Sequence, residues 1–430
     1  MNSKGAMVRR AVVPLVVAGM AVTLITGCST SSSVTATADP NEKVTLEFSQ
    51  WWEPELPAGA LRTLMDEFQT ENPNITVKLL SAPYAATKDQ TVAGAASGVM
   101  SDVVGLDGAW VSDFAKQGAL ADLSQLMKDA GYDESQLASQ VKIKDSTFMI
   151  PVLNFVYPMF TNDDLLAKAG VTAPPTNRTE FTAAAEAVTK SGDAKGWVLP
   201  LSLQAPNGIQ NDVMSWAWAS GGSMLKKGAP DLTNADVTSA TNYVKDLWDK
   251  GVIAPGSLTM TEQDKVEEFT NGRVGMMIDS LSHVTSIREK NPNLKFSISA
   301  IPATDGFTGK RGIPYASWGI GVSDTGKHKA EAWKLVQFLM SEKTNSTLST
   351  LAHAFPGNTT STPDFTGTDP LFKTAFDIYK SGTPVNEFVG LPVAEQLMRD
   401  FDEQFQGALT GTQSVDDMLT KAQAAWTAKF

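Results

Sequence analysis

The chemistry that this sequence suggests most directly is the stacking of flat rings on a ligand, because the chain has ten tryptophans. Trp51 and Trp52 follow the first alternation of apolar and polar residues, and Trp110 follows a short apolar run. We expect these rings near the carboxyl ends of strands, where open α/β sheets bind ligands. A ring beside a carboxylate or an amide suits a sugar, which has an apolar face and an edge of hydroxyls. Core packing is the alternative for Trp52, Trp110 and Trp318.

The common catalytic motifs are absent from the sequence. It contains no His-Glu-x-x-His, Gly-x-Ser-x-Gly or Gly-x-Gly-x-x-Gly. The segment 321–328 resembles a P-loop, but His328 replaces the Ser or Thr that binds magnesium. Three separated histidines disfavour a histidine-based zinc site, and a single cysteine excludes an internal disulfide. We therefore expect no enzyme, no cofactor and no metal, although 47 acidic residues leave a glycosidase-type carboxylate pair open.

The first residues have the pattern of a secretory signal. Lys4, Arg9 and Arg10 precede an apolar run over 11–25, which is shorter than the roughly 20 residues of a membrane-spanning helix. The segment Leu-Ile-Thr-Gly-Cys that ends at Cys28 resembles the lipobox of bacterial lipoproteins. The resemblance implies a lipoprotein signal peptide over 1–27 and acylation of Cys28, which would anchor the protein to the outer face of the cytoplasmic membrane. An ordinary signal peptide with a chance cysteine is the alternative.

Length and charge limit the remaining classes of protein. A chain of 430 residues exceeds the roughly 250–300 residues that one core supports, so we expect two domains. The net charge of −12 becomes −15 when the three basic residues of the signal are removed. This acidity argues against nucleic acid as a partner. Small polar residues after the signal predict a flexible tether over 28–43.

Strand and helix patterns alternate in the rest of the chain. Strands are predicted at 44–48, 75–80 and 102–106, with helices at 61–68 and 84–96 between them. This order predicts an α/β fold with parallel strands and crossover helices. The absence of a Pro- or Ser-rich linker after the tether suggests that the chain crosses between its domains more than once.

An ordered set of motifs resembles the extracellular solute-binding proteins of carbohydrate ABC importers, which are related to maltodextrin-binding protein. The similarity extends over roughly 44–430. Its motifs lie at Val44–Glu53, Phe68–Val77, Ser101–Trp110, Thr161–Thr176 and Phe269–Asp279.

The resemblance implies two α/β lobes, joined by a hinge that the chain crosses repeatedly, with a ligand cleft between them. Lobe one would contain 44–152 and 317–365, and lobe two 153–316 and 366–430. The expected ligand-binding residues are Trp52, Glu53, Asp107, Trp110, Asn154, Trp218, Gly221, Gly222, Asp279, Trp318 and Gly319. The family commonly continues its motif after Asp279 with Gly and Trp, whereas this chain has Ser280–His283, so a stacking ring is missing there.

The function implied by the resemblance is capture of a mono- or oligosaccharide by closure of the lobes and delivery to the permease subunits, by a monomer. One alternative is a binder of a non-sugar solute such as a glycerol phosphoester. The expected contacts contain no cation, which favours a neutral ligand and leaves Arg273 and Arg311 to be examined. A secreted glycoside hydrolase or lyase and a structural or adhesive lipoprotein are further alternatives.

Overall fold

Three parallel strands form one side of the larger sheet. The computed structural model describes residues 42–192, 194–366 and 368–430. Strand β1 (Val44–Gln50) lies between β2 (Ile75–Ser81) and β3 (Val103–Leu106) and is parallel to both. The predicted strands, and the crossover helices between them, are confirmed here. The carboxyl ends of these strands lead into the turns that contain Trp51 and Asp107.

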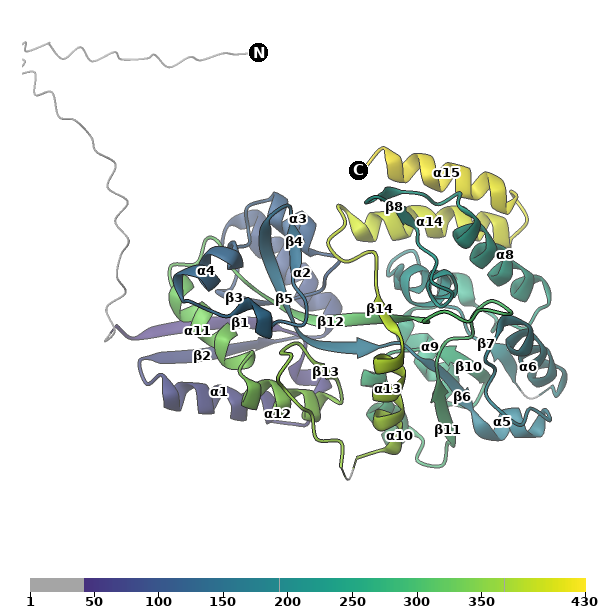
Figure 1. Cartoon of the computed structure of the whole chain (residues 1–430), viewed down its shortest axis with the longest axis horizontal. Coiled ribbons are helices and arrows are strands. Elements are labelled where there is room, and N and C mark those ends of the chain that lie inside the picture. The colour runs from purple at the N-terminus through teal and green to yellow at the C-terminus, as the bar shows by residue number, and fades with distance from the viewer. Residues whose placement is uncertain (1–41, 193, 367) are drawn as a thin grey trace, which may run out of the picture. The chain divides into compact units, whose positions relative to one another are not determined.

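Two long strands complete the larger sheet (Figure 1). Strand β12 (Gly312–Val322) lies between β3 and β5 (Ser146–Val156) and is antiparallel to both. The short strands β4 (Val141–Ile143), β13 (Phe355–Pro356) and β14 (Thr383–Val385) pair with these two long strands. Thus a segment more than 200 residues from β3 in the sequence lies beside it in the sheet.

The smaller sheet belongs to the other half of the fold. Its strand order is β11 (Phe296–Ser299), β6 (Met159–Asn162), β10 (Val274–Ile278) and β7 (Lys195–Trp197). The sequence predicts one strand over 155–160, but the chain leaves the larger sheet after Val156 and enters the smaller one at Met159. Pro158, which has no N–H to donate, lies in this gap. Strands β8 (Leu225–Lys226) and β9 (Ala229–Pro230) form a separate hairpin.

Helices cover both sheets. Those that contact the larger sheet are α1 (Ala60–Glu71), α2 (Tyr84–Ser97), α3 (Val111–Lys116), α4 (Leu123–Asp129), α7 (Ser215–Trp218), α11 (Lys329–Leu339) and α12 (Glu342–Ala352). Those that contact the smaller sheet are α5 (Asp163–Lys168), α6 (Arg178–Lys190), α9 (Glu262–Thr270) and α13 (Pro370–Ser381), and α13 also contacts β14 of the larger sheet. The remaining helices are α8 (Ala235–Asp249), α10 (Val284–Lys290), α14 (Ala394–Leu409) and α15 (Val415–Thr427).

Local capping chemistry fixes where several helices begin. The side chains of Asn177, Asn234 and Ser414 accept hydrogen bonds from backbone N–H groups at the first turns of α6, α8 and α15. An Asn or Ser directly before an apolar helical pattern predicts such a cap, and all three residues have this position in the sequence. In α6 the Glu180 carboxylate accepts from the N–H of Thr176, one residue before the expected cap.

Of the three predicted crossing points, those at 152/153 and 316/317 lie inside β5 and β12, and the third, at 365/366, lies in the loop between β13 and α13. Strands β5 and β12 pair at the first two points, with Leu153 opposite Trp318 and Asn154 opposite Ser317. Residues 42–430 belong to one compact unit, and the lobe boundaries themselves stay a prediction. No helix in the described part of the chain is long and apolar enough to cross a membrane. The signal peptide, Cys28 and nearly all of the predicted tether lie outside the described residues.

Candidate functional site

A cavity of about 820 Å³ lies where elements of both sheets meet. From the larger sheet and its loops come Trp51, Asp107, Trp110 and Trp318. From the other half come residues that follow β10, that begin α9 and that form the single π-helical turn Ile209–Val213. The cavity is of the size that small-molecule sites usually have.

Three aromatic rings form one wall of the cavity. The Tyr84 ring lies 4.9 Å from Trp110 and 5.2 Å from Trp51, measured between ring centroids, and Trp51 lies 5.5 Å from Trp110. Asp107 holds this wall together, because its carboxylate accepts hydrogen bonds from the Tyr84 hydroxyl at 3.2 Å and from the Ala109 N–H at 2.8 Å. Burial raises the pKa of Asp107 despite these bonds.

A fourth ring enters the cavity from β12. Trp318 stacks on Trp52, which is completely buried behind it, and also contacts Phe155. The neighbouring Ser317 lines the cavity and donates a hydrogen bond to the amide oxygen of buried Asn154 at 2.8 Å. Trp52 and Asn154 therefore support side chains that line the cavity, and neither lines it directly.

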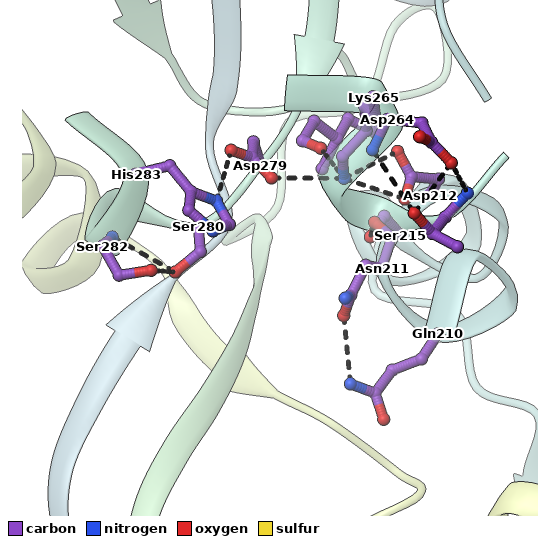
Figure 2. Close-up of polar contacts among 12 residues, drawn as sticks. Gln210, Asn211, Asp212, Ser215, Asp264, Lys265, Asp279, Ser280, Ser282 and His283 are labelled. Atoms are coloured by element: carbon purple, nitrogen blue, oxygen red, sulfur yellow. Dashed lines mark hydrogen bonds and ion pairs between the residues drawn. The ribbon is translucent and has the colours of Figure 1, made fainter. Parts of the chain in front are cut away.

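The half of the cavity built around the smaller sheet supplies polar side chains. Gln210 and Asn211 come from the π-helical turn, and the Gln210 amide donates to the Asn211 oxygen at 3.0 Å (Figure 2). Glu262 opens α9, and His283 ends the short 3-10 helix Leu281–His283 that follows β10. Aromatic rings are thus contributed mainly by one half, and amides, a carboxylate and an imidazole by the other.

A chain of buried charges lies behind this polar wall. The Asp279 carboxylate contacts His283 Nδ1 at 2.8 Å on one side and Lys265 Nζ at 3.3 Å on the other (Figure 2). Lys265 also contacts Asp212 at 3.3 Å and donates to the Ile278 carbonyl at 2.6 Å. The side chains of Lys265, Asp212 and Asp279 have no exposed surface.

The charges in this chain stabilise one another. Burial alone would lower the pKa of His283, but the Asp279 carboxylate outweighs burial and raises the pKa to about 9. Asp279 in turn keeps a lowered pKa despite burial, because His283 and Lys265 favour its charged form. Burial raises the pKa of Asp212 to about 8, against the attraction of Lys265.

Two further charged groups line the cavity. Lys88 forms an ion pair with Glu395, and burial lowers the pKa of the Lys88 ammonium. Glu55 follows the Trp51–Trp52 turn, and burial raises its pKa to about 7 while His283 opposes this rise. The two arginines that the sequence singles out do not line the cavity: Arg273 pairs with Glu268, and Arg311 donates to the carbonyls of Ile301 and Thr176.

Of the eleven expected ligand-binding residues, Asp107, Trp110 and Trp318 line the cavity. Asp279 lies directly behind His283, as Trp52 lies behind Trp318 and Asn154 behind Ser317. The remaining five residues have other neighbours and do not line the cavity. They are Glu53 beside Ser81, Trp218 beside Glu387, Gly221 near Phe307, Gly222 against Asp236 and Gly319 against Met149. A role in ligand binding stays a prediction for all eleven.

Most residues that line the cavity are not among the eleven expected ones, and Trp51, Tyr84, Glu55, Lys88 and Glu262 are examples. Trp51 and Tyr84 had signals of their own, in the double tryptophan and at the start of a predicted helix. Glu55, Lys88 and Glu262 had none, since each resembles the exposed charge of an ordinary helix. The sequence singles out His283 only as part of the segment that replaces the expected ring.

Known proteins match this chain over most of its length. The sequence profile of the bacterial extracellular solute-binding proteins matches residues 54–346. A putative binding protein of Brucella abortus (strain 2308) is 31% identical over 279 residues, which cover 63% of this chain and 66% of that protein. An uncharacterised lipoprotein of Streptomyces antibioticus is 25% identical over 338 residues, or 74% of this chain and 70% of that one.

A solved structure supports the same fold. The GacH receptor of Streptomyces glaucescens GLA.O, crystallised unliganded and with acarbose, has a TM-score of 0.73 and 20% identity. It covers 90% of this chain and 98% of its own. The chain therefore has the periplasmic-binding-protein-like α/β fold.

Proposed function

Because the chain belongs to the bacterial extracellular solute-binding proteins, we propose that it captures a mono- or oligosaccharide for an ABC importer. One observation carries this proposal: the rings of Tyr84, Trp110 and Trp318 share one cavity with the side chains of Asp107 and Gln210. Rings cover the apolar faces of a sugar, while carboxylates and amides bind its hydroxyls. The related GacH receptor was crystallised with acarbose.

The mechanism follows from the fact that each half of the fold supplies a different part of the cavity wall. A ligand that contacts the aromatic half and the polar half together would stabilise a closed form, and only such differential affinity shifts the population. The paired strands β5 and β12 connect the halves where the crossings are predicted, so bending there would close the cavity. The closed form would then dock on the permease, as a monomer held at the membrane by acylated Cys28.

A thermal-shift screen tests the proposal. Mono- and oligosaccharides should raise the melting temperature, because a ligand that binds only the folded state stabilises it. Amino acids and glycerol phosphoesters serve as controls. A shift with a phosphoester and with no sugar contradicts the proposal. Release of smaller sugars over time would indicate a glycoside hydrolase instead.

The charges of the cavity favour a sugar over a phosphoester. The two cationic side chains that line it already have carboxylate partners, Lys88 with Glu395 and His283 with Asp279. Asp107, Glu55 and Glu262 add further acidic groups. A phosphate would therefore meet mainly negative charge.

The anchor has its own test. Replacement of Cys28 by Ser should move the protein from the membrane fraction to the medium, because the acyl chain would have no attachment point. If the Cys28→Ser variant stays in the membrane fraction, the lipoprotein assignment is wrong.

A further inference from the structure

Three side chains in the cavity wall offer ligands for a cation. One atom from each of Glu262, Asp279 and His283 can be chosen so that all three lie within 4.8 Å of one another. They come from the start of α9, the end of β10 and the following 3-10 helix, so tertiary structure alone brings them together. The sequence disfavours a metal site because its histidines are far apart, but a mixed site needs only one of them.

The imidazole of His283 is oriented as metal-binding histidines usually are. Its Nδ1 lies 2.8 Å from Asp279 Oδ2, which leaves Nε2 free of this hydrogen bond. A histidine that binds a metal through one nitrogen commonly donates the other N–H to a carboxylate. The Asp279 carboxylate also contacts Lys265 Nζ at 3.3 Å, so both of its oxygens already have a cationic neighbour (Figure 2). Asp279 is therefore the positioning residue, and His283 is the ligand.

Glu262 supplies a second ligand that has no other task. Its Oε1 is buried, and no hydrogen-bond donor reaches it from the described residues. Leaving a buried carboxylate oxygen without a partner is costly, and such an atom in a folded protein calls for an explanation such as an ion. The Glu55 carboxylate, which also lines the cavity, interacts electrostatically with both Glu262 and His283.

The chemistry of the two ligands indicates which kind of ion would fit at this position. One imidazole and carboxylate oxygens form a ligand set that suits Zn²⁺ better than the all-oxygen set preferred by Ca²⁺ or Mg²⁺.

We propose that Glu262 and His283, with Asp279 as the positioning residue, bind one Zn²⁺-like transition-metal ion in the cavity wall. Glu262 and His283 both line the cavity, so an ion held between them would be within reach of the hydroxyls of a ligand. The ion is thus a second ligand of the protein, and its binding does not require that the solute be a sugar.

Calorimetric titration of metal-stripped protein, prepared without a histidine tag, with zinc chloride tests the proposal. We expect one ion per chain, and at least tenfold weaker binding in Glu262→Gln and in His283→Gln. Glu267→Gln is the matched control, since Glu267 is exposed on the same helix, and it should bind zinc as the unchanged protein does. Glu262 is only half buried at the first turn of α9, so its replacement by Gln should leave the fold intact.

The imidazole signals identify the ligand directly, because the chain has only three histidines. Zinc should shift the ¹⁵N resonances of one imidazole, and this signal should be missing in His283→Gln. Three results would overturn the proposal: no zinc binding, a shift of His328 or His353, or tighter binding of calcium than of zinc. A sugar screen on zinc-free protein is read separately, so the proposed function and the metal site can fail independently.

Discussion

Trp318 lies flat against Trp52, with ring centroids 5.4 Å apart and ring planes 5° from parallel. Only Trp318 lines the cavity, and Trp52 is completely buried. The Phe48 ring packs edge-on against Trp52, with ring centroids 5.3 Å apart. The cavity ring is therefore fixed in place by a second ring and by the core, so little side-chain entropy is lost when a ligand stacks on it.

This stack separates a binding tryptophan from a supporting one. Trp110→Ala and Trp318→Ala should each weaken sugar binding about tenfold, or ~1.4 kcal/mol, because each removes a lining ring. Trp52→Ala should instead destabilise the fold by ~3–5 kcal/mol, as expected for a large buried ring. Calorimetric titration with the sugar and denaturant unfolding measure the two effects. Trp248→Ala is the control for sugar binding, because Trp248 is half-buried on α8 and does not line the cavity. A Trp318→Ala variant with unchanged affinity contradicts this assignment.

Lys265 should be essential for stability. It has no exposed side-chain surface and contacts both Asp212 and Asp279 at 3.3 Å. Lys265→Met removes the cation that Asp212 and Asp279 share, and breaking a buried ion pair costs ~3–5 kcal/mol. The free energy of unfolding in urea measures this loss. Lys373→Met is the matched control, because the Lys373–Asp377 pair is largely exposed. Exposed pairs contribute ~0–1 kcal/mol. Equal losses in the two variants would show that the buried network is not stabilising.

Asp402 should make stability depend on pH far from the cavity. Its side chain is buried in α14, where Gln406 donates to Oδ1 at 3.3 Å and Oδ2 has no hydrogen-bond partner among the described residues. Burial raises its pKa from 3.8 to about 8. The folded state therefore holds a proton that the unfolded state has released, so this contribution is full below pH 4 and is lost as the pH rises to about 8.

Asp402→Asn imitates the protonated carboxyl and should remove this dependence. We expect it to stabilise the protein by at least ~1 kcal/mol at pH 8.5 and to have little effect at pH 4.5. Urea unfolding at the two pH values gives the difference. Glu71→Gln, at an exposed position on α1, should show no such change. A variant that is less stable than the unchanged protein at pH 8.5 would mean that the carboxylate is charged in the fold.

Gly222 lies where its neighbours leave no room for a side chain. A Cβ atom there would lie 2.6 Å from the Asp236 Cβ and 3.0 Å from the Ala217 carbonyl oxygen. Gly222→Ala should therefore destabilise the protein by ~1–3 kcal/mol through overpacking and leave sugar affinity unchanged. Thermal unfolding and titration of the folded variant separate these effects. A tenfold loss of affinity without loss of stability would restore Gly222 as a binding residue.

Local signals explain the parts of the fold that the sequence predicts well. Strands β1, β2 and β3 have alternating or apolar runs, and the caps at Asn177 and Ser414 rest on side chains that bond their own backbone. These features depend on neighbours within a few residues. The α/β fold class, which the order of these local patterns predicts, is also confirmed.

Tertiary contacts explain what the sequence reasoning misses. Lys265 lies in the segment Glu-Gln-Asp-Lys-Val-Glu-Glu, which reads as an exposed helix surface, yet it is completely buried. Its burial depends on Asp212 and Asp279, which lie on other elements. Glu55 and His283 interact across the cavity although more than 200 residues separate them. Nothing in the sequence near Glu55 or near His283 indicates that the two residues interact.

The place of β12 in the larger sheet has a consequence for the order of folding. Strands β3 and β5 are complete by Val156, but the strand that pairs with both is Gly312–Val322. Until that segment emerges, each of them has an unpaired edge, which is a template for pairing with another chain. While the roughly 150 residues between these segments are synthesised or exported, the first half of the protein is therefore prone to aggregation. It should depend on a chaperone during that interval.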